Sequence, residues 1–162
     1  MKSTHSLAAK SIREELKKAF PAVKFSVKSD SFSGGNSVHI SWKDGVTGQA
    51  VDEIVNKYQY GHFDGMTDCY NYTNVKKDFP QVKYVQTRRE VSEEIYKTIF
   101  EEAKKTYSGW ELLESLDQTC KNLMNKWCVW TARDYIHRIV SKIDLTNCNG
   151  IEALNQYNAR TF

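Results

Sequence analysis

Hydrophobic residues recur at every third or fourth position near the start of the chain. Ala8, Ala9, Ile12 and Leu16 follow this spacing, which gathers them on one face of a helix. Proline cannot continue a helix, so the segment is expected to end at Pro21. The pattern predicts an amphipathic helix with one buried face.

After this helix, hydrophobic and polar residues alternate, which is the period of a β-strand. Residues 23–28 and 37–42 share this period, so we expect them to pair as antiparallel strands. The connection between them, Ser29 to Ser37 (SDSFSGGNS), is polar and nine residues long, and we expect a loop there rather than a minimal hairpin. The inward-facing residues of the two strands are Phe25, Val27, Val38, Ile40 and Trp42.

Two more strands and one more helix are predicted before residue 90. Turn chemistry at residues 43–45 (KDG) precedes a helix that Thr47 can cap. A short strand is expected at residues 66–72, and another at residues 82–88.

Helical spacing dominates the rest of the chain. Ser92 opens a predicted helix with Ile95 and Ile99 on its inner face, and the spacing of a helical capping box recurs at residues 108–111 and 131–134. We therefore expect three or four helices, with a break near Trp130.

The predicted order is α-β-β-α-β-β followed by helices, which is typical of an α+β fold. The sheet is expected to be small and mainly antiparallel, because the first two strands are too close in sequence for a crossover helix. We divide the chain into an α+β domain at residues 1–90 and a helical C-terminal extension at residues 91–162, packed on it.

Charge is distributed unevenly between these two parts. Residues 1–90 hold fourteen Lys or Arg against ten Asp or Glu, a net charge of +4, whereas residues 91–162 hold nine against ten, a net charge of −1. An excess of positive charge favours an anionic partner for the first part, although ordinary surface charge gives the same pattern.

The cysteines and the hydrophobicity indicate a cellular compartment. Cys69, Cys120, Cys128 and Cys148 contain no CxxC pair, and we expect reduced thiols rather than a disulfide framework. No stretch approaches the roughly 18 apolar residues of a membrane span, and no signal region precedes the first helix. These features predict a cytoplasmic protein without membrane attachment.

Several short motifs occur in one order in the first half of the chain. They are Phe20-Pro21 followed by Lys24-Phe25-Ser26-Val27, SFSGG at residues 31–35, WKDG at residues 42–45, FDGM at residues 63–66, and Asp68 with Tyr70. With these motifs, roughly residues 6–90 resemble member twenty-nine of the large polyvalent protein-associated domain families. Val46 departs from the resemblance, since a proline is expected after the glycine of WKDG.

The resemblance implies a function in a mobile genetic element. Domains of this family occur in proteins encoded by bacteriophages and by conjugative elements such as plasmids. They are thought to protect incoming DNA or to counter host defence. The resemblance brings no established reaction onto any residue of this chain.

The predicted loop at residues 29–37 is a candidate anion-binding segment. Successive backbone N–H groups with small side chains can cradle a phosphate, and nearby lysines would add positive charge. The alternative is a plain hairpin connection. The candidate contacts to nucleic acid or another partner are Lys24, Lys28, Ser31, Ser33, Gly34, Gly35, Asn36, Lys43, Arg88 and Arg89.

Aromatic residues offer two further candidate surfaces. The tyrosines and phenylalanine at positions 58, 60, 63, 70 and 72 either stack nucleic-acid bases or fill the core. Trp110, Trp127 and Trp130 are either anchors of a protein interface or core residues.

Two carboxylates keep a catalytic alternative open. Asp64 and Asp68 lie four residues apart around Gly65, a pair that can hold a divalent metal, although Asp64-Gly65 is also simple turn chemistry. No nucleophile elbow and no zinc spacing is present, so we predict no catalytic residue, metal or cofactor.

Together these features favour a non-enzymatic accessory or anti-defence protein that binds a macromolecule. The expected partner is nucleic acid or a host defence protein, such as a CRISPR–Cas or restriction component. The alternative is a metal-dependent hydrolase acting on nucleic acid or a nucleotide.

Overall fold

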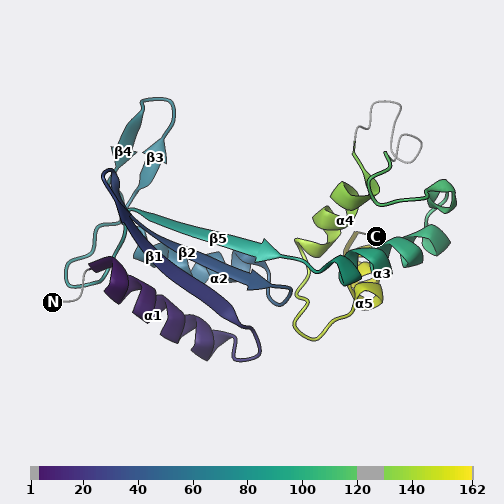
Figure 1. Cartoon of the computed structure of the whole chain (residues 1–162), viewed down its shortest axis with the longest axis horizontal. Coiled ribbons are helices and arrows are strands. Elements are labelled where there is room, and N and C mark those ends of the chain that lie inside the picture. The colour runs from purple at the N-terminus through teal and green to yellow at the C-terminus, as the bar shows by residue number, and fades with distance from the viewer. Residues whose placement is uncertain (1–3, 120–129, 162) are drawn as a thin grey trace. The chain divides into compact units, whose positions relative to one another are not determined.

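The computed structural model of the 162-residue chain describes residues 4–119 and 130–161. The chain divides into two compact units. The first unit contains residues 1–43 and 48–90, and the second contains residues 44–47 and 91–162. Figure 1 shows the elements of both units.

The first unit is an α+β structure with a three-stranded sheet and a separate two-stranded hairpin. The sheet has the order β1-β2-β5, and β3 pairs with β4. The elements in chain order are α1 (Thr4–Ala19), β1 (Phe25–Phe32), β2 (Gly35–Lys43), α2 (Gly48–Val55), the 3-10 helix η1 (Asn56–Tyr58), β3 (His62–Asp64), β4 (Cys69–Asn71) and β5 (Tyr84–Glu90).

The amphipathic first helix and the first strand pair confirm the sequence prediction. Ala8, Ile12 and Leu16 of α1 are buried. β1 and β2 pair antiparallel, with Val27 opposite Ile40. The two alternating patterns therefore face the same core, as matching periods require.

The predicted loop at residues 29–37 is wrong. Strand β1 continues to Phe32 and β2 begins at Gly35, so that Ser33 and Gly34 alone connect them. The ring of Phe32 stacks on Tyr84, with 6.3 Å between their centroids and 20° between their planes. Contact with the first residue of β5 thus stabilises a polar segment in an extended conformation that its composition does not favour.

The prediction of a mainly antiparallel sheet is confirmed only in part: β1–β2 and β3–β4 pair antiparallel, but the three-stranded sheet is mixed. Strand β5 pairs parallel to β2, with Val38 opposite Val85 and Ile40 opposite Thr87. The segment between the two strands contains α2 and the β3–β4 hairpin. It is long enough for the crossover that a parallel pair needs.

The strand predicted at residues 66–72 is shorter in the structure. Only Cys69–Asn71 is extended, and it pairs with His62–Asp64 across a turn that contains Gly65. The strand predicted at residues 82–88 runs instead from Tyr84 to Glu90.

The core of the first unit lies between one face of the sheet and two helices. The guanidinium of Arg13 in α1 donates a 2.8 Å hydrogen bond to the carbonyl oxygen of Val27 in β1. Thr87 in β5 donates a 2.8 Å hydrogen bond to Asp52 in α2. The buried residues between these elements include Ala8, Ile12, Leu16, Val27, Val38, Ile40, Trp42, Val51 and Val55. Among the described residues of the first unit, both α-helices pack on this one face, and the opposite face of the sheet carries neither of them.

The second unit is helical in the residues that the structure describes. Its elements are α3 (Glu93–Thr106), the 3-10 helix η2 (Trp110–Leu112), α4 (Ala132–Val140) and α5 (Gly150–Thr161). They enclose a core that contains Tyr96, Ile99, Phe100, Ala103, Trp110, Leu113, Leu116, Ala132, Ile136, Ile139, Val140, Ile143, Leu145, Ala153 and Leu154.

The two capping boxes predicted in this unit have different outcomes. Thr131 accepts a hydrogen bond from the backbone N–H of Asp134, whose side chain accepts in return, so the second box is confirmed. At the first, Gly109 has a φ of 87° and only a 3-10 turn follows, with no side-chain cap. The left-handed glycine redirects the chain, and the described residues after the 3-10 turn, 113–119, are not helical.

Several predictions fall on residues 120–129, which lie outside the described residues. They concern Cys120, Cys128, Trp127 and the helix expected to end before Trp130. Cys69 and Cys148 are free thiols. Within the described parts of the chain, no helix is long and apolar enough to cross a membrane.

Candidate functional site

The face of the sheet opposite α1 and α2 carries two rows of polar side chains. Strand pairing places Lys28 of β1, His39 of β2 and Gln86 of β5 side by side. Ser26, Ser41 and Arg88 form the neighbouring row, two residues further along each strand. Residues that pair across strands share a face, so the six side chains lie on one surface.

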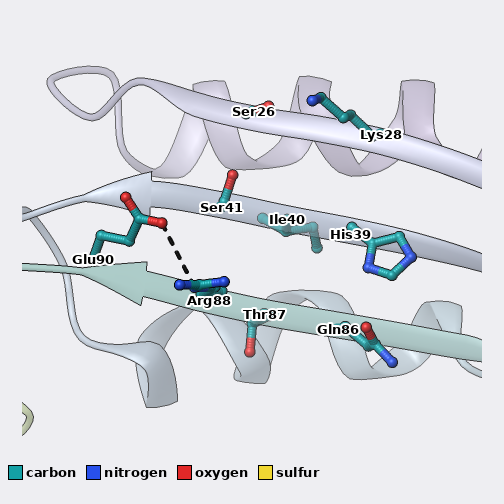
Figure 2. A pocket seen from close by; sticks show the side chains of 9 residues that line it. All are labelled: Ser26, Lys28, His39, Ile40, Ser41, Gln86, Thr87, Arg88 and Glu90. Carbon is teal, nitrogen blue, oxygen red and sulfur yellow. Dashed lines mark ion pairs between the residues drawn. The ribbon is translucent and has the colours of Figure 1, made fainter.

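These rows line a depression of about 700 Å³ on this face. Figure 2 shows its side chains on the three neighbouring strands β1, β2 and β5. Most of them end in hydroxyl, amide or charged groups. The lining residues are Ser26, Lys28, His39, Ile40, Ser41, Gln86, Thr87, Arg88 and Glu90.

The charges of this polar face favour an anionic ligand. Lys28 and Arg88 are exposed on β1 and β5. Arg88 Nε lies 3.6 Å from Glu90 Oε1, and the side chain of Arg88 is 80% exposed. An ion pair this open to water is weak, so Glu90 does not prevent Arg88 from binding a phosphate.

The histidine of the polar face has a hydrogen-bond partner on its own strand. His39 Nε2 and Ser37 Oγ are 3.0 Å apart, which fixes the orientation of an otherwise exposed ring. Sequence reasoning did not select His39, Ser26, Ser41 or Gln86. The sequence could have indicated them, because each alternates along its strand with residues of the buried face.

The predicted basic contacts do not all lie together. Lys43 is exposed at the end of β2, two residues beyond Ser41, and so shares the polar face. Lys24 is exposed directly before β1. Arg89 pairs with the buried Trp42 and therefore lies on the helix-covered side, away from its neighbour Arg88.

The tip of the β1–β2 hairpin is tied to Lys83, just before β5. The backbone N–H of Lys83 donates a 2.8 Å hydrogen bond to Asn36 Oδ1, and Lys83 Nζ donates one of 2.8 Å to the carbonyl oxygen of Gly34. Gly35 has a φ of +146°, and a Cβ there would lie 2.7 Å from Lys83 Cδ. These contacts within the chain explain Gly35 and Asn36. Ser31 and Ser33 are exposed near the same tip.

The predicted aromatic cluster divides into buried and exposed members. Tyr58 is 1% exposed, lies 4.8 Å from Phe79 between ring centroids, and donates a hydrogen bond to Glu15. It belongs to the core. Phe63, in contrast, is 52% exposed on β3.

Three of the predicted tyrosines join two further rings in a continuous series that we call the aromatic row. Phe32 contacts Tyr84, Tyr84 contacts Tyr70 at 5.6 Å, and Tyr70 contacts Tyr72 at 5.2 Å between centroids. Tyr60 stacks on Tyr72 at 5.6 Å with 9° between the planes. Sequence reasoning missed Phe32 and Tyr84, because their contact depends on the parallel register of β5.

Both carboxylate oxygens of Asp64 take part in the turn between β3 and β4. Oδ1 accepts a hydrogen bond from the backbone N–H of Met66, and Oδ2 accepts one from the hydroxyl of Thr67, each 2.9 Å long. These hydrogen bonds lower the pKa of Asp64. Asp68 has a φ of 53° in the same turn. Among the described residues, no three His, Cys, Asp or Glu side chains are grouped so as to hold a metal ion.

The tryptophans of the second unit have different surroundings. Trp110 is buried among Phe100, Tyr107 and Tyr135. Trp130 is 45% exposed, with the guanidinium of Arg138 5.9 Å from its ring centroid. Trp110 is therefore a core residue.

Comparison with known proteins identifies a family for the first unit. No curated protein and no solved structure matches the chain. The family model for large polyvalent protein associated domain 29 matches residues 3–92, which is more than half of the chain and confirms the resemblance inferred from its motifs. The chain therefore belongs to the large polyvalent protein associated domain 29 family.

Proposed function

We propose that the family domain of this chain binds nucleic acid through the polar face of its sheet, as an accessory or anti-defence factor of a phage or conjugative element. The observation that supports this most directly is the position of Lys28 and Arg88, both exposed around a polar depression on the face of the sheet opposite α1 and α2. Basic side chains arranged over such a surface are the usual contacts to phosphate.

The chemistry of the depression favours nucleic acid over a protein partner. The centres of protein interfaces are depleted of charged residues and enriched in apolar and aromatic ones. Here the lining includes the charged side chains of Lys28, Arg88 and Glu90 beside the polar His39 and Ser41. Hydroxyl and amide groups beside these cations are suited to phosphate and sugar oxygens.

The salt dependence of binding tests this proposal. Anisotropy of a labelled duplex and of a labelled single strand would be measured over a range of salt concentrations, with the unchanged chain and with Lys28→Ala combined with Arg88→Ala. Each lost phosphate contact lowers the slope of log K against log salt by about 1, so the double variant is expected to lower it by about 2 on duplex.

A charge-matched control separates the polar face from net charge. Lys17 and Lys18 are exposed on α1, which packs against the opposite side of the sheet. Lys17→Ala with Lys18→Ala removes the same charge and should leave the slope unchanged. If the salt slope fell equally in both double variants, the result would contradict a site on the polar face. Absence of binding to either nucleic acid would leave a host defence protein as the partner to test.

A further inference from the structure

The aromatic row continues the polar face at the end where the β1–β2 hairpin closes. Alternation places Phe32 on the same face as Asp30 and Lys28, and Tyr84 pairs with Ser37 on that face. Four residues separate Phe32 from Lys28, about 13 Å along an extended strand. Figure 1 shows β3 and β4, which carry Tyr70, at this same end of the sheet.

Two rings of the row are open to solvent. Phe32 is 46% exposed and Tyr72 is 67% exposed, whereas Tyr60, Tyr70 and Tyr84 are partly buried. Large aromatic rings that remain exposed beside a basic surface are the arrangement on which unpaired bases stack. The faces of paired bases are covered by their neighbours inside a duplex.

The inner rings hold this platform in place. The hydroxyl of Tyr70 donates a 2.5 Å hydrogen bond to the carbonyl oxygen of Lys83. Lys83 Nζ lies 5.1 Å from the ring centroid of Tyr70 and 5.5 Å from that of Tyr84. The rings are therefore fixed before a ligand arrives, and Lys83 adds positive charge beside them. Asp30 is the acidic side chain on this part of the face, and its Oδ1 accepts a hydrogen bond from the N–H of Ser31.

We infer that the site takes single-stranded nucleic acid, with unpaired bases stacked on Phe32 and Tyr72 and phosphates bound by Lys28 and Arg88. This inference rests on the proposed function and adds to it a choice between strand types. The basic face supplies attraction that any nucleic acid feels. The aromatic row supplies stacking that only unpaired bases can use.

Binding of oligo(dT), of oligo(U) and of a duplex of equal length to the full chain tests the inference. The expected order is single strands tighter than duplex, and the two homopolymers show whether DNA or RNA is preferred. Phe32→Ala and Tyr72→Ala should each weaken single-strand binding by at least about fivefold, the lower end of what one stacked base contributes. Duplex affinity and the salt slope should not change, because no phosphate contact is lost.

Phe63 provides a matched control, since it is a phenylalanine of similar exposure, 52%, that is not part of the aromatic row. Phe63→Ala should leave single-strand binding unchanged. Phe32→Tyr, which keeps an aromatic ring at this position, should retain single-strand binding. If Phe32→Ala perturbs folding, as its thermal unfolding would reveal, Tyr72→Ala carries the test, because Tyr72 lies on the chain after β4 and outside the three-stranded sheet.

The outcomes separate this inference from the proposed function. Salt-dependent binding with equal affinity for single strand and duplex would overturn the inference and leave the proposed function standing. Equal effects of Tyr72→Ala and Phe63→Ala on single-strand binding would also overturn the inference and leave the proposed function standing. If the unchanged chain binds neither nucleic acid, both proposals fail.

Discussion

The side-chain oxygen of Asn36 accepts a 2.8 Å hydrogen bond from the backbone N–H of Lys83, a residue 47 positions later in the chain. Asn36 is the second residue of β2, and Lys83 directly precedes β5. The next residue of each segment, Ser37 and Tyr84, forms the first pair of the parallel register. The hydrogen bond thus fixes the alignment on which the polar face and the aromatic row both depend.

Asn36→Ala should lower the free energy of unfolding of the first unit by about 1–2 kcal/mol. The substitution removes a hydrogen bond and leaves a partly buried N–H without its acceptor. Hydrogen exchange of the Lys83 and Tyr84 amides would measure the effect locally. Asn36→Asp keeps an acceptor oxygen and should retain most of the protection, so equal losses in the two variants would contradict this role of the side chain.

Gly35→Ala should be more harmful than Gly48→Ala. Gly35 combines a φ of +146° with a Cβ position 2.7 Å from Lys83 Cδ, whereas a Cβ at Gly48 would meet nothing within 4 Å. We expect Gly35→Ala to lose roughly 1–3 kcal/mol, because it combines backbone strain with a clash. Gly48→Ala, at the start of α2, should be neutral or slightly stabilising. Chemical denaturation of the two variants side by side tests the difference.

Patterns of hydrophobic spacing predicted the elements that depend on residues close to one another in the sequence. The helical spacing of Ile12 and Leu16 and the alternation of Val27 with Ile40 identified α1 and the β1–β2 pair, and both are confirmed. Each pattern specifies which side of an element is buried. It therefore sufficed to predict antiparallel pairing between adjacent strands.

The remaining features depend on contacts between distant residues. Alternation does not distinguish a parallel from an antiparallel partner, so the place of β5 beside β2 was not predictable from period alone. The serine-rich hairpin tip is extended because Lys83 and Tyr84 contact Asn36, Gly34 and Phe32. Propensity was overridden there by tertiary structure.

Only part of the candidate site was predictable, because the site also depends on contacts between distant residues. Lys28 and Arg88 could be selected as exposed basic residues on separate strands, but their rows became visible only with the register of three strands. Arg89 was grouped with Arg88 by adjacency, although neighbours on a strand point to opposite faces.

Removal of the Tyr58 hydroxyl should destabilise the contact between α1 and η1. The hydroxyl donates a 3.0 Å hydrogen bond to Glu15 Oε1, while Lys57 Nζ lies 2.6 Å from Glu15 Oε2. Tyr58→Phe keeps the ring against Phe79 and so isolates the hydrogen bond. A loss of about 1–2 kcal/mol is expected for a bond to a charged acceptor. Unchanged urea unfolding would contradict it.

Alkaline pH should weaken the first unit through its buried phenols. Burial, together with the nearby phenols of Tyr60, Tyr84 and Tyr72, raises the pKa of Tyr70 to about 12 from the ordinary 10.0. Burial and the hydrogen bond to Glu15 also raise the pKa of Tyr58. The folded state then holds more protons than the unfolded state above pH 10, so its stability decreases as the pH rises from about 10 to about 12.

Phenolate absorbance and urea unfolding at several pH values measure this decline. Tyr70→Phe removes one of the groups, and its stability should change less between pH 10 and 12 than that of the unchanged chain. An equal change in both proteins would show that Tyr70 does not contribute to the alkaline transition.

The capping box at the start of α4 gives the last prediction, in the second unit. Thr131 accepts from the backbone N–H of Asp134 at 3.1 Å, and Asp134 Oδ2 accepts from the N–H and the hydroxyl of Thr131 at 2.9 and 2.7 Å. The backbone and side-chain hydrogen bonds from Thr131 lower the pKa of Asp134. Thr131→Ala should destabilise the unit by about 1 kcal/mol, as loss of an N-cap does.

The same substitution should raise the pKa of Asp134, because one of its two donors is lost. A lowered pKa in the folded state stabilises the protein above the ordinary range of aspartate and ceases to do so as the pH falls. The acid-induced loss of stability should therefore be smaller in Thr131→Ala than in the unchanged chain. Carboxyl chemical shifts followed by NMR report the pKa directly, and Thr131→Ser, which keeps the hydroxyl, should leave it low. An Asp134 pKa that is the same with alanine and with serine at position 131 would mean that the hydroxyl does not set it.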